Sequence, residues 1–169
     1  NLTFLIFLFL ITKANSLIEI DITRGNLDPL PIAVSPLFQD DSSKKNSSNE
    51  LKIENVGSEI SSVVENNLKT SGLFNPLSKE AFLQKPDIAH LKPRFEDWAL
   101  IKAQALITGK VKIENKKLKV EFRLWDILAG REMMALAFTT VPSNWRRVGH
   151  IISDKVYERL TGEKGYFDT

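Results

Sequence analysis

The chain has 169 residues, about the length of one domain, and 43% of them are hydrophobic and 26% charged, as in an ordinary globular protein. Its 23 Lys and Arg residues against 21 Asp and Glu residues leave a net charge of +2, which is too small for a broad field that attracts nucleic acid or anionic membranes. The sequence has no cysteine and two histidines, which excludes disulfides, thiol chemistry and thiolate or histidine-rich metal centres.

The first residues form an apolar run from Leu2 to Ile11 that a single threonine interrupts. A membrane-spanning helix needs about 20 apolar residues, whereas a signal peptide needs about 7 to 15 followed by small residues, which Ala14 and Ser16 supply. We therefore expect residues 1–16 to be a signal peptide, incomplete at its start, that is cleaved after Ser16. A buried strand or helix is the alternative, but the run lacks polar alternation. An exported protein without cysteine fits the bacterial periplasm.

The residues after this site alternate between apolar and acidic side chains over Leu17–Ile22. The isoleucines fall on one face and the two acidic residues on the other, which predicts a β-strand at the start of the mature chain. One interpretation is an ordinary first strand of the sheet. The other is a detachable strand that adds to the sheet edge of another protein, where backbone hydrogen bonds give affinity.

Proline positions and the spacing of apolar residues predict the secondary structure of the first half of the mature chain. Apolar residues at helical spacing predict a helix from Ile53 to Leu68, and Gly72 is expected to end it. The other expected elements are a strand at Pro31–Leu37, a solvated polar loop at Gln39–Asn49, a short edge strand at Phe74–Leu77 and an irregular stretch at Ser78–Pro93.

The second half of the mature chain is expected to form a helix, a three-stranded meander and a last helix. The expected elements are a helix at Glu96–Ala105, strands at Leu106–Ile113, Leu118–Asp126 and Met133–Val141, hairpin turns at Glu114–Lys117 and Ala129–Gly130, and a final helix of about 18 residues capped by Pro142–Asn144. This order predicts an α+β domain with helices packed on a mixed sheet of about five to six strands.

Catalytic chemistry has little support in the sequence. His150 and Asp154 lie four residues apart on one helix face and could form a base and its orienting carboxylate, but no motif marks a nucleophile. A hydrogen-bonded structural histidine is the more common outcome. The basic residues at Trp145–Arg147 and the lysines of Lys110–Lys119 could suggest RNA contact, but the lysines alternate with core positions as on a solvated strand face.

The residues from Trp145 to Thr169 resemble the end of the N-terminal domain of the TolB family, periplasmic components of the Tol-Pal system. The blocks Ile20–Gly25, Pro31–Pro36, Ser71–Phe74, Trp98–Gly109 and Arg123–Asp126 match the family as well, so that the resemblance covers 17–169. Eight positions carry the C-terminal motif: Arg146, His150, Asp154, Leu160, Thr161, Gly162, Gly165 and Phe167. The resemblance implies a fold similar to the anticodon-binding domain of class II aminoacyl-tRNA synthetases.

The resemblance also implies a function. It predicts a non-enzymatic periplasmic adaptor without cofactor or metal, a monomer that supports outer-membrane integrity, cell division and colicin import. TolA would bind the mature N-terminal segment, which consists of Leu17, Ile18, Glu19, Ile20, Asp21 and Ile22. Residues 23–169 would form the domain, and a six-bladed propeller expected after Thr169 would bind Pal. The alternative is a free-standing exported ligand-binding or hydrolytic domain that uses His150 and Asp154.

Overall fold

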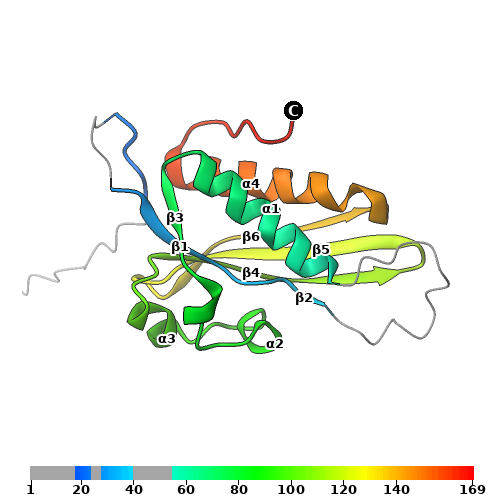
Figure 1. Ribbon diagram of the computed structural model, residues 1–169, viewed down its shortest axis with the longest axis horizontal. Coiled ribbons are helices and arrows are strands. Elements are labelled where there is room, and N and C mark those ends of the chain that lie inside the picture. Colours follow the sequence, from blue (N-terminus) through cyan, green and yellow to red (C-terminus); the bar gives the residue numbers. More distant parts are fainter. Residues whose placement is uncertain (1–17, 24–27, 40–54) are drawn as a thin grey trace, which may run out of the picture.

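The computed structural model describes residues 18–23, 28–39 and 55–169 (Figure 1). The expected signal peptide, Leu17 and most of the expected polar loop lie outside the described residues. The strands are β1 (Leu30–Val34), β2 (Phe38–Gln39), β3 (Phe74–Pro76), β4 (Ala105–Glu114), β5 (Lys117–Asp126) and β6 (Arg131–Thr140). The helices are α1 (Val56–Thr70), α2 (Pro86–Ala89), α3 (Phe95–Leu100) and α4 (Trp145–Thr161), with short 3-10 turns η2 (Lys79–Ala81) and η3 (Pro142–Asn144).

The strands form one mixed six-stranded sheet. Its order is β3-β1-β4-β5-β6, and β2 pairs with β4 beyond the end of β1. The pairs β1 with β3, β1 with β4 and β2 with β4 are parallel, whereas β4, β5 and β6 form an antiparallel meander. The α+β fold class expected from the sequence is confirmed.

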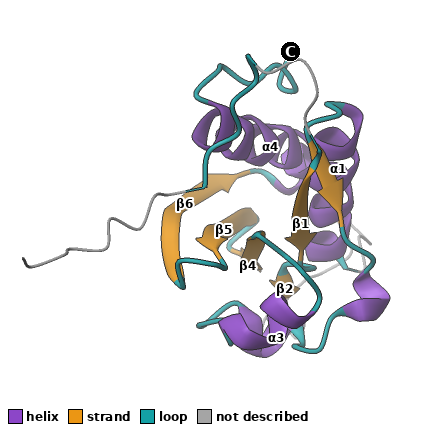
Figure 2. Cartoon of the chain, turned by 90° about the vertical axis from the view of Figure 1, so that its left-hand side faces the viewer, coloured by secondary structure: helices purple, strands orange, loops and turns teal. Residues whose placement is uncertain are grey.

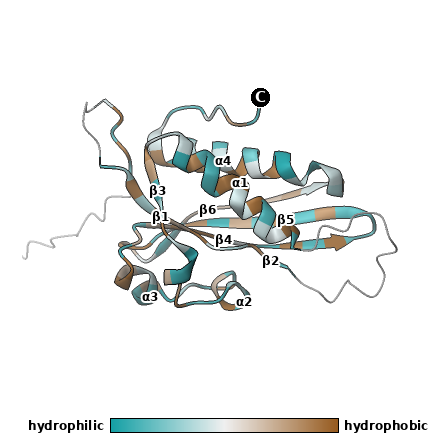
Figure 3. Cartoon of the chain, in the orientation of Figure 1, coloured by the Kyte–Doolittle hydropathy of each residue, from teal (hydrophilic) through white to brown (hydrophobic). Residues whose placement is uncertain are grey.

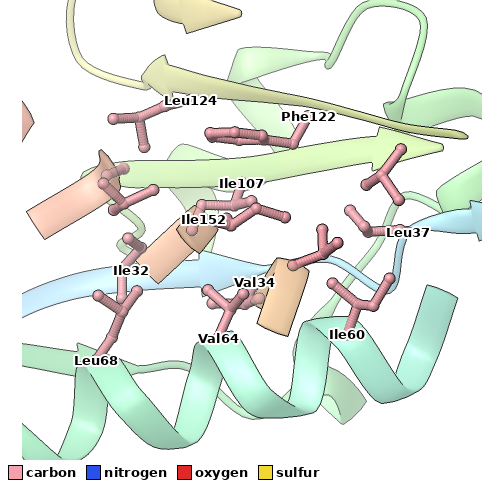
Figure 4. Packing of buried hydrophobic residues seen from close by; sticks show 14 of the residues in the cluster. Ile32, Val34, Leu37, Ile60, Val64, Leu68, Ile107, Phe122, Leu124 and Ile152 are labelled. Carbon is pink, nitrogen blue, oxygen red and sulfur yellow. The ribbon is translucent and has the colours of Figure 1, made fainter. Parts of the chain in front are cut away.

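Two long helices, α1 and α4, cover one face of the sheet (Figure 2). Helical spacing predicts their apolar stripes, and most of these side chains are buried, whereas Val63 of α1 and Trp145 of α4 are half-buried. Figure 4 shows Ile60, Val64 and Leu68 of α1 pointing toward Phe122 and Leu124 of β5. The main hydrophobic core therefore lies between these helices and the sheet.

The short helices α2 and α3 cover part of the opposite face. Trp98 of α3 is buried against Leu106 and Trp125, and its indole Nε1 donates a hydrogen bond of 3.0 Å to Gln84 Oε1. Beyond these helices the paired ends of β4 and β5 extend as a long hairpin (Figure 1). We call the sheet face opposite α1 and α4 the open face.

Turn residues close the meander where the sequence predicts turns. Asn115 and Lys116 both have positive φ, at 53° and 58°, which a two-residue hairpin turn requires. Gly130 has a φ of 63° in the second turn. The short edge strand and the end of α1 before Gly72 are also confirmed, whereas the stretch expected to be irregular contains η2 and the short helix α2.

Three local expectations are wrong. The helix expected at 96–105 ends at Leu100, which is 74% exposed, because Lys102 turns the chain with a φ of 63° and Ala105 already begins β4. Gln39, expected in a loop, pairs in β2 with Val111. Asn144 occupies the first cap position of α4, but its side-chain amide donates to Thr140 Oγ1 at 3.0 Å instead of capping the helix.

Candidate partner-binding site at the ends of the domain

The residues Ile18–Thr23, which we call the terminal segment, lie against the end of α4 without joining the sheet. The backbone N–H of Ile20 donates a hydrogen bond of 2.7 Å to the carbonyl oxygen of Leu160. The backbone N–H of Ile18 donates to Asp126 Oδ2 at 3.2 Å. The strand expected over 17–22 is therefore wrong for its described residues, which form coil and a turn.

The alternation of the terminal segment is nevertheless visible in its burial. Ile20 is 8% exposed and packs with the main core, and Ile18 is partly buried beside it. Glu19 and Asp21 are exposed, as expected. Ile22 breaks the pattern because it is 38% exposed. The sequence thus predicted which side of the segment turns inward for four of the five described residues.

A tight turn ends the segment at Thr23. Its backbone N–H and its hydroxyl both donate to Asp21 Oδ1, at 3.1 and 2.6 Å. Aspartate commonly closes such a turn through its own side chain, which offers the backbone an alternative to a sheet ladder. The turn gives a local reason why the alternating residues do not continue as a strand.

The last turn of α4 holds the terminal segment. Leu160 is fully buried, and its carbonyl is one of those that a helix end leaves without an intrahelical partner. Gly162 ends the helix with a φ of 75°, and its N–H donates to the carbonyl of Glu158. Thr161 Oγ1 donates to the carbonyl of Tyr157 at 2.8 Å and accepts from the N–H of Glu163 at 3.1 Å.

The C-terminal segment, residues 163–169, folds back along α4. Both carboxylate oxygens of Asp154 accept backbone N–H groups, from Phe167 at 2.7 Å and from Asp168 at 3.1 Å. Arg147 forms an ion pair with Asp168 at 3.0 Å. Gly165 passes so close to Asp154 that a Cβ atom there would collide with its backbone and side chain, which explains the glycine.

Aromatic rings complete the contact between this segment and α4. The ring of Tyr157 meets those of Tyr166 and Phe167 edge-on, with centroids 5.5 and 5.9 Å apart. On its other side Tyr157 meets Phe74 of β3 at 6.3 Å. Burial, together with Tyr166 and Glu163 nearby, raises the pKa of the Tyr157 hydroxyl above its ordinary value.

The motif positions of the C-terminal block make contacts within the domain. Asp154, Gly165 and Phe167 hold the C-terminal segment, and Leu160, Thr161 and Gly162 shape the end of α4. Arg146 stacks over the ring of Trp145 at 4.5 Å, whereas its neighbour Arg147 makes the ion pair with Asp168. Sequence reasoning missed Arg147, because no spacing rule relates it to a residue 21 positions later.

The expected catalytic pair has other partners. His150 Nδ1 lies 2.9 Å from the side-chain amide nitrogen of Asn67 on α1, which also donates to Ser153 Oγ at 3.0 Å. Both oxygens of Asp154 accept backbone N–H groups of the C-terminal segment, and the described hydrogen bond of the imidazole is to Asn67 and not to this carboxylate. The contacts fit the interpretation of His150 as a structural histidine. Within the described ranges no group of three or more His, Cys, Asp or Glu residues is placed to hold a metal ion.

The fold defines a class of small α+β domains with two helices on a mixed sheet. Its likeness to CT253 from Chlamydia trachomatis (TM-score 0.53, 14% identity, 80% of this chain and 100% of that one) concerns the fold alone. The likeness to PelC from Paraburkholderia phytofirmans also concerns the fold alone (TM-score 0.51, 16% identity, 88% and 95% covered).

A solved structure with a higher TM-score and higher identity points to one family within this class. TolB from Acinetobacter baumannii has a TM-score of 0.64 and 23% identity, over 84% of this chain and 31% of that one. Residues 18–133 match the model of the TolB amino-terminal domain, and the chain belongs to that family. It is 74% identical over 166 residues to the Tol-Pal system protein TolB of Pelagibacter ubique, covering 98% of this chain and 37% of that protein. The chain therefore spans a little over a third of that relative.

Proposed function

We propose that the chain is the N-terminal domain of a periplasmic adaptor of the Tol-Pal system, supporting outer-membrane integrity, cell division and protein import, colicins included. Family membership and the 74% identity to a Tol-Pal system protein support this role. In this proposal the domain has no catalytic activity, consistent with the structural contacts of His150 and Asp154. Residues 1–16 direct export. No helix in the described part of the chain has the length and apolar character to cross a membrane.

The observation that carries the proposal is the light attachment of the terminal segment. Its described contacts with the rest of the domain are one backbone hydrogen bond to Leu160, one to the Asp126 side chain, and the packing of a buried Ile20 and a partly buried Ile18. Burying an isoleucine contributes about 1.5–3 kcal/mol, so release of the segment costs a small part of a domain's stability. A segment that leaves at this cost is available to a partner.

Leu17–Ile22 is the segment that we propose binds TolA. Glu19 and Ile22 are exposed in the docked state, and release would also free the inward side chains of Ile18 and Ile20. The alternating pattern suits addition as a strand to a sheet edge of TolA, because backbone groups then pair along the edge and alternate side chains enter its surface. Pal would bind through the propeller of the longer protein.

The proposal is tested by the affinity of the full chain for the third domain of TolA. Deleting Leu17–Ile22 should abolish binding, and Ile22→Asp should weaken it by about 1 to 3 kcal/mol if that side chain fills an apolar pocket. Ile88→Asp is the matched control, because Ile88 is a 48% exposed isoleucine on α2. Equal binding by the deletion variant and the unmodified chain would refute the assignment.

A further inference from the structure

The open face of the β4–β5 hairpin concentrates positive charge in a nearly neutral chain. Residues 110–121 contain five lysines and two glutamates, a net charge of +3 in a protein whose total is +2. The open face carries Lys110 and Lys112 from β4 and Lys117 and Lys119 from β5, because these positions alternate with the buried ones. The remaining lysine, Lys116, sits in the hairpin turn.

Two of these lysines lie directly opposite each other. Lys112 pairs in register with Lys119, and like charges at such positions destabilise a sheet. Both ammonium groups share one carboxylate, with Glu114 oxygens 3.0 and 2.8 Å away, and these contacts lower the pKa of Glu114. One carboxylate for two ammonium groups leaves this part of the face positive. Proteins commonly keep such destabilising arrangements at functional sites, so the Lys112–Lys119 pair points to a binding role.

A hollow of about 430 Å³ lies next to these lysines on the open face. Ala135 and Ala137 of β6 form part of its floor and leave space above them. Lys110, Glu121 and Arg123 line it from β4 and β5, and Lys110 forms an ion pair with Glu121 at 3.5 Å. Leu91, 69% exposed, lines it just after α2. An exposed leucine beside small floor residues and cationic groups fits a bulky apolar side chain flanked by carboxylates.

Specific contacts fix the wall of the hollow. The Arg123 guanidinium donates to the carbonyl of His90 at 3.3 Å and forms an ion pair with Glu132 at 3.0 Å. The imidazole of His90 stacks on Phe38 at a centroid distance of 4.7 Å, and its Nδ1 lies 3.0 Å from the carbonyl oxygen of Pro86. The hollow is therefore preformed, which lowers the ordering cost of binding.

We propose that this hollow and the adjoining lysines bind an extended acidic segment of a partner protein. A bulky apolar side chain of that segment packs on Leu91 above the alanines, and its carboxylates face Lys110, Lys112 and Lys119. Charge complementarity selects the acidic partner. A hollow lined from several elements accepts a protruding side chain of a polypeptide, which a flat membrane surface does not offer. α1 and α4 lie over the other face of the sheet (Figure 3). The terminal segment contacts the end of α4, and none of its described residues lines the hollow.

The probe is a fluorescein-labelled twelve-residue peptide of alternating Glu and Leu, with a Gln-for-Glu peptide as its uncharged control. Fluorescence anisotropy with the full chain at low salt should show saturable binding of the acidic peptide that weakens steeply as salt is added. Leu91→Asp should weaken binding by at least tenfold. Leu100→Asp, at a 74% exposed leucine outside the hollow, should change it by less than twofold.

The charged rim is tested in the same assay. Lys112→Gln with Lys119→Gln should weaken binding by at least fivefold, whereas Lys155→Gln on α4 should leave it unchanged, and thermal melts confirm that each variant is folded. Equal binding of the Gln peptide, equal loss with Leu100→Asp or no peptide binding would overturn the proposal. Binding to phosphatidylglycerol vesicles with the same residue dependence, without peptide binding, would assign the surface to membranes and overturn it as well.

Discussion

Two segments of this chain share one sequence pattern and adopt different structures. β5 alternates apolar and charged residues, and so does the terminal segment. β5 pairs over its whole length with β4, and with β6 on its other side. In Ile18–Thr23 the backbone N–H groups of Ile18 and Ile20 donate to the rest of the domain, and Asp21 and Thr23 form a local turn. Alternation therefore predicts which side chains turn inward, but a strand also needs a neighbouring backbone edge. The short turns on both sides of β5 supply those edges locally.

The comparison bears on function because the terminal segment keeps the pattern of a strand without an edge to pair with among the described residues. An edge on another protein could supply the missing backbone partners. β5, paired on both sides, has no such capacity. The two segments should consequently differ in how much stability each contributes and in how readily each opens.

The largest expected effect is the loss of core packing at β5. Phe122→Ala should lower the free energy of unfolding by about 3–5 kcal/mol, because Phe122 is fully buried between the helices and the sheet and stacks with Phe138. Urea denaturation measures this change. Glu121→Ala, on the open face of the same strand, should change it by less than about 0.5 kcal/mol. A decrease in the free energy of unfolding of less than about 1 kcal/mol for Phe122→Ala would contradict the claim that β5 contributes more stability than the terminal segment.

Gly165→Ala should have the next largest effect, because its Cβ would collide with Asp154 and displace the C-terminal segment. Overpacking of this kind costs about 1–3 kcal/mol. Gly72→Ala is an informative contrast, since a Cβ there meets no atom within 4 Å and its cost comes from the positive φ of 75° alone. Denaturation should show a larger loss at Gly165. An equal or smaller loss at Gly165 would contradict the close approach to Asp154 as the reason for the glycine.

Ile20→Ala should lower the free energy of unfolding by only about 1–2 kcal/mol, below the ~2–5 kcal/mol of an isoleucine in a fixed core. The reason is that the terminal segment can shift or detach while the sheet and helices stay folded. Urea denaturation of the full chain provides the measurement. A loss of 4 kcal/mol or more would show that the segment is an integral part of the core and is not cheaply released.

Glu114→Gln should have the smallest effect on stability, and the effect should appear only at a pH at which the Glu114 carboxyl is ionised. Its pKa lies below the ordinary 4.5, because Lys119 and Lys112 hydrogen-bond to the charged carboxylate. The folded protein thus favours the ionised form, and the contribution is present above the unfolded pKa and lost as pH falls through the lowered one. The difference in Tm between the two proteins should vanish in acid, and a difference that grows in acid would contradict this sign.

Much of the fold followed from local patterns. The stripes of α1 and α4, the meander and both of its turns needed only spacing and turn residues, as at Asn115 and Gly130. The helix expected to reach Ala105 failed because the start of β4 is decided by pairing with β1 and β5, which local sequence does not encode.

The candidate site was predictable in part. Alternation indicated that Ile20 would turn inward, but not that its partner would be the carbonyl of Leu160, some 140 residues away. The ion pair between Arg147 and Asp168 and the contact of His150 with Asn67 likewise depend on tertiary packing. The hollow beside Leu91 was not predicted, because its floor and wall come from separate elements.

The most direct test of the central claim is amide hydrogen exchange at Ile20 and Val120, with and without the third domain of TolA. Light attachment predicts that the Ile20 amide of the free chain exchanges at least a hundredfold faster than the Val120 amide of β5, and that TolA slows exchange at Ile20 while leaving Val120 unchanged. Equal protection of the two amides in the free chain, or no change at Ile20 on adding saturating TolA, would contradict the account.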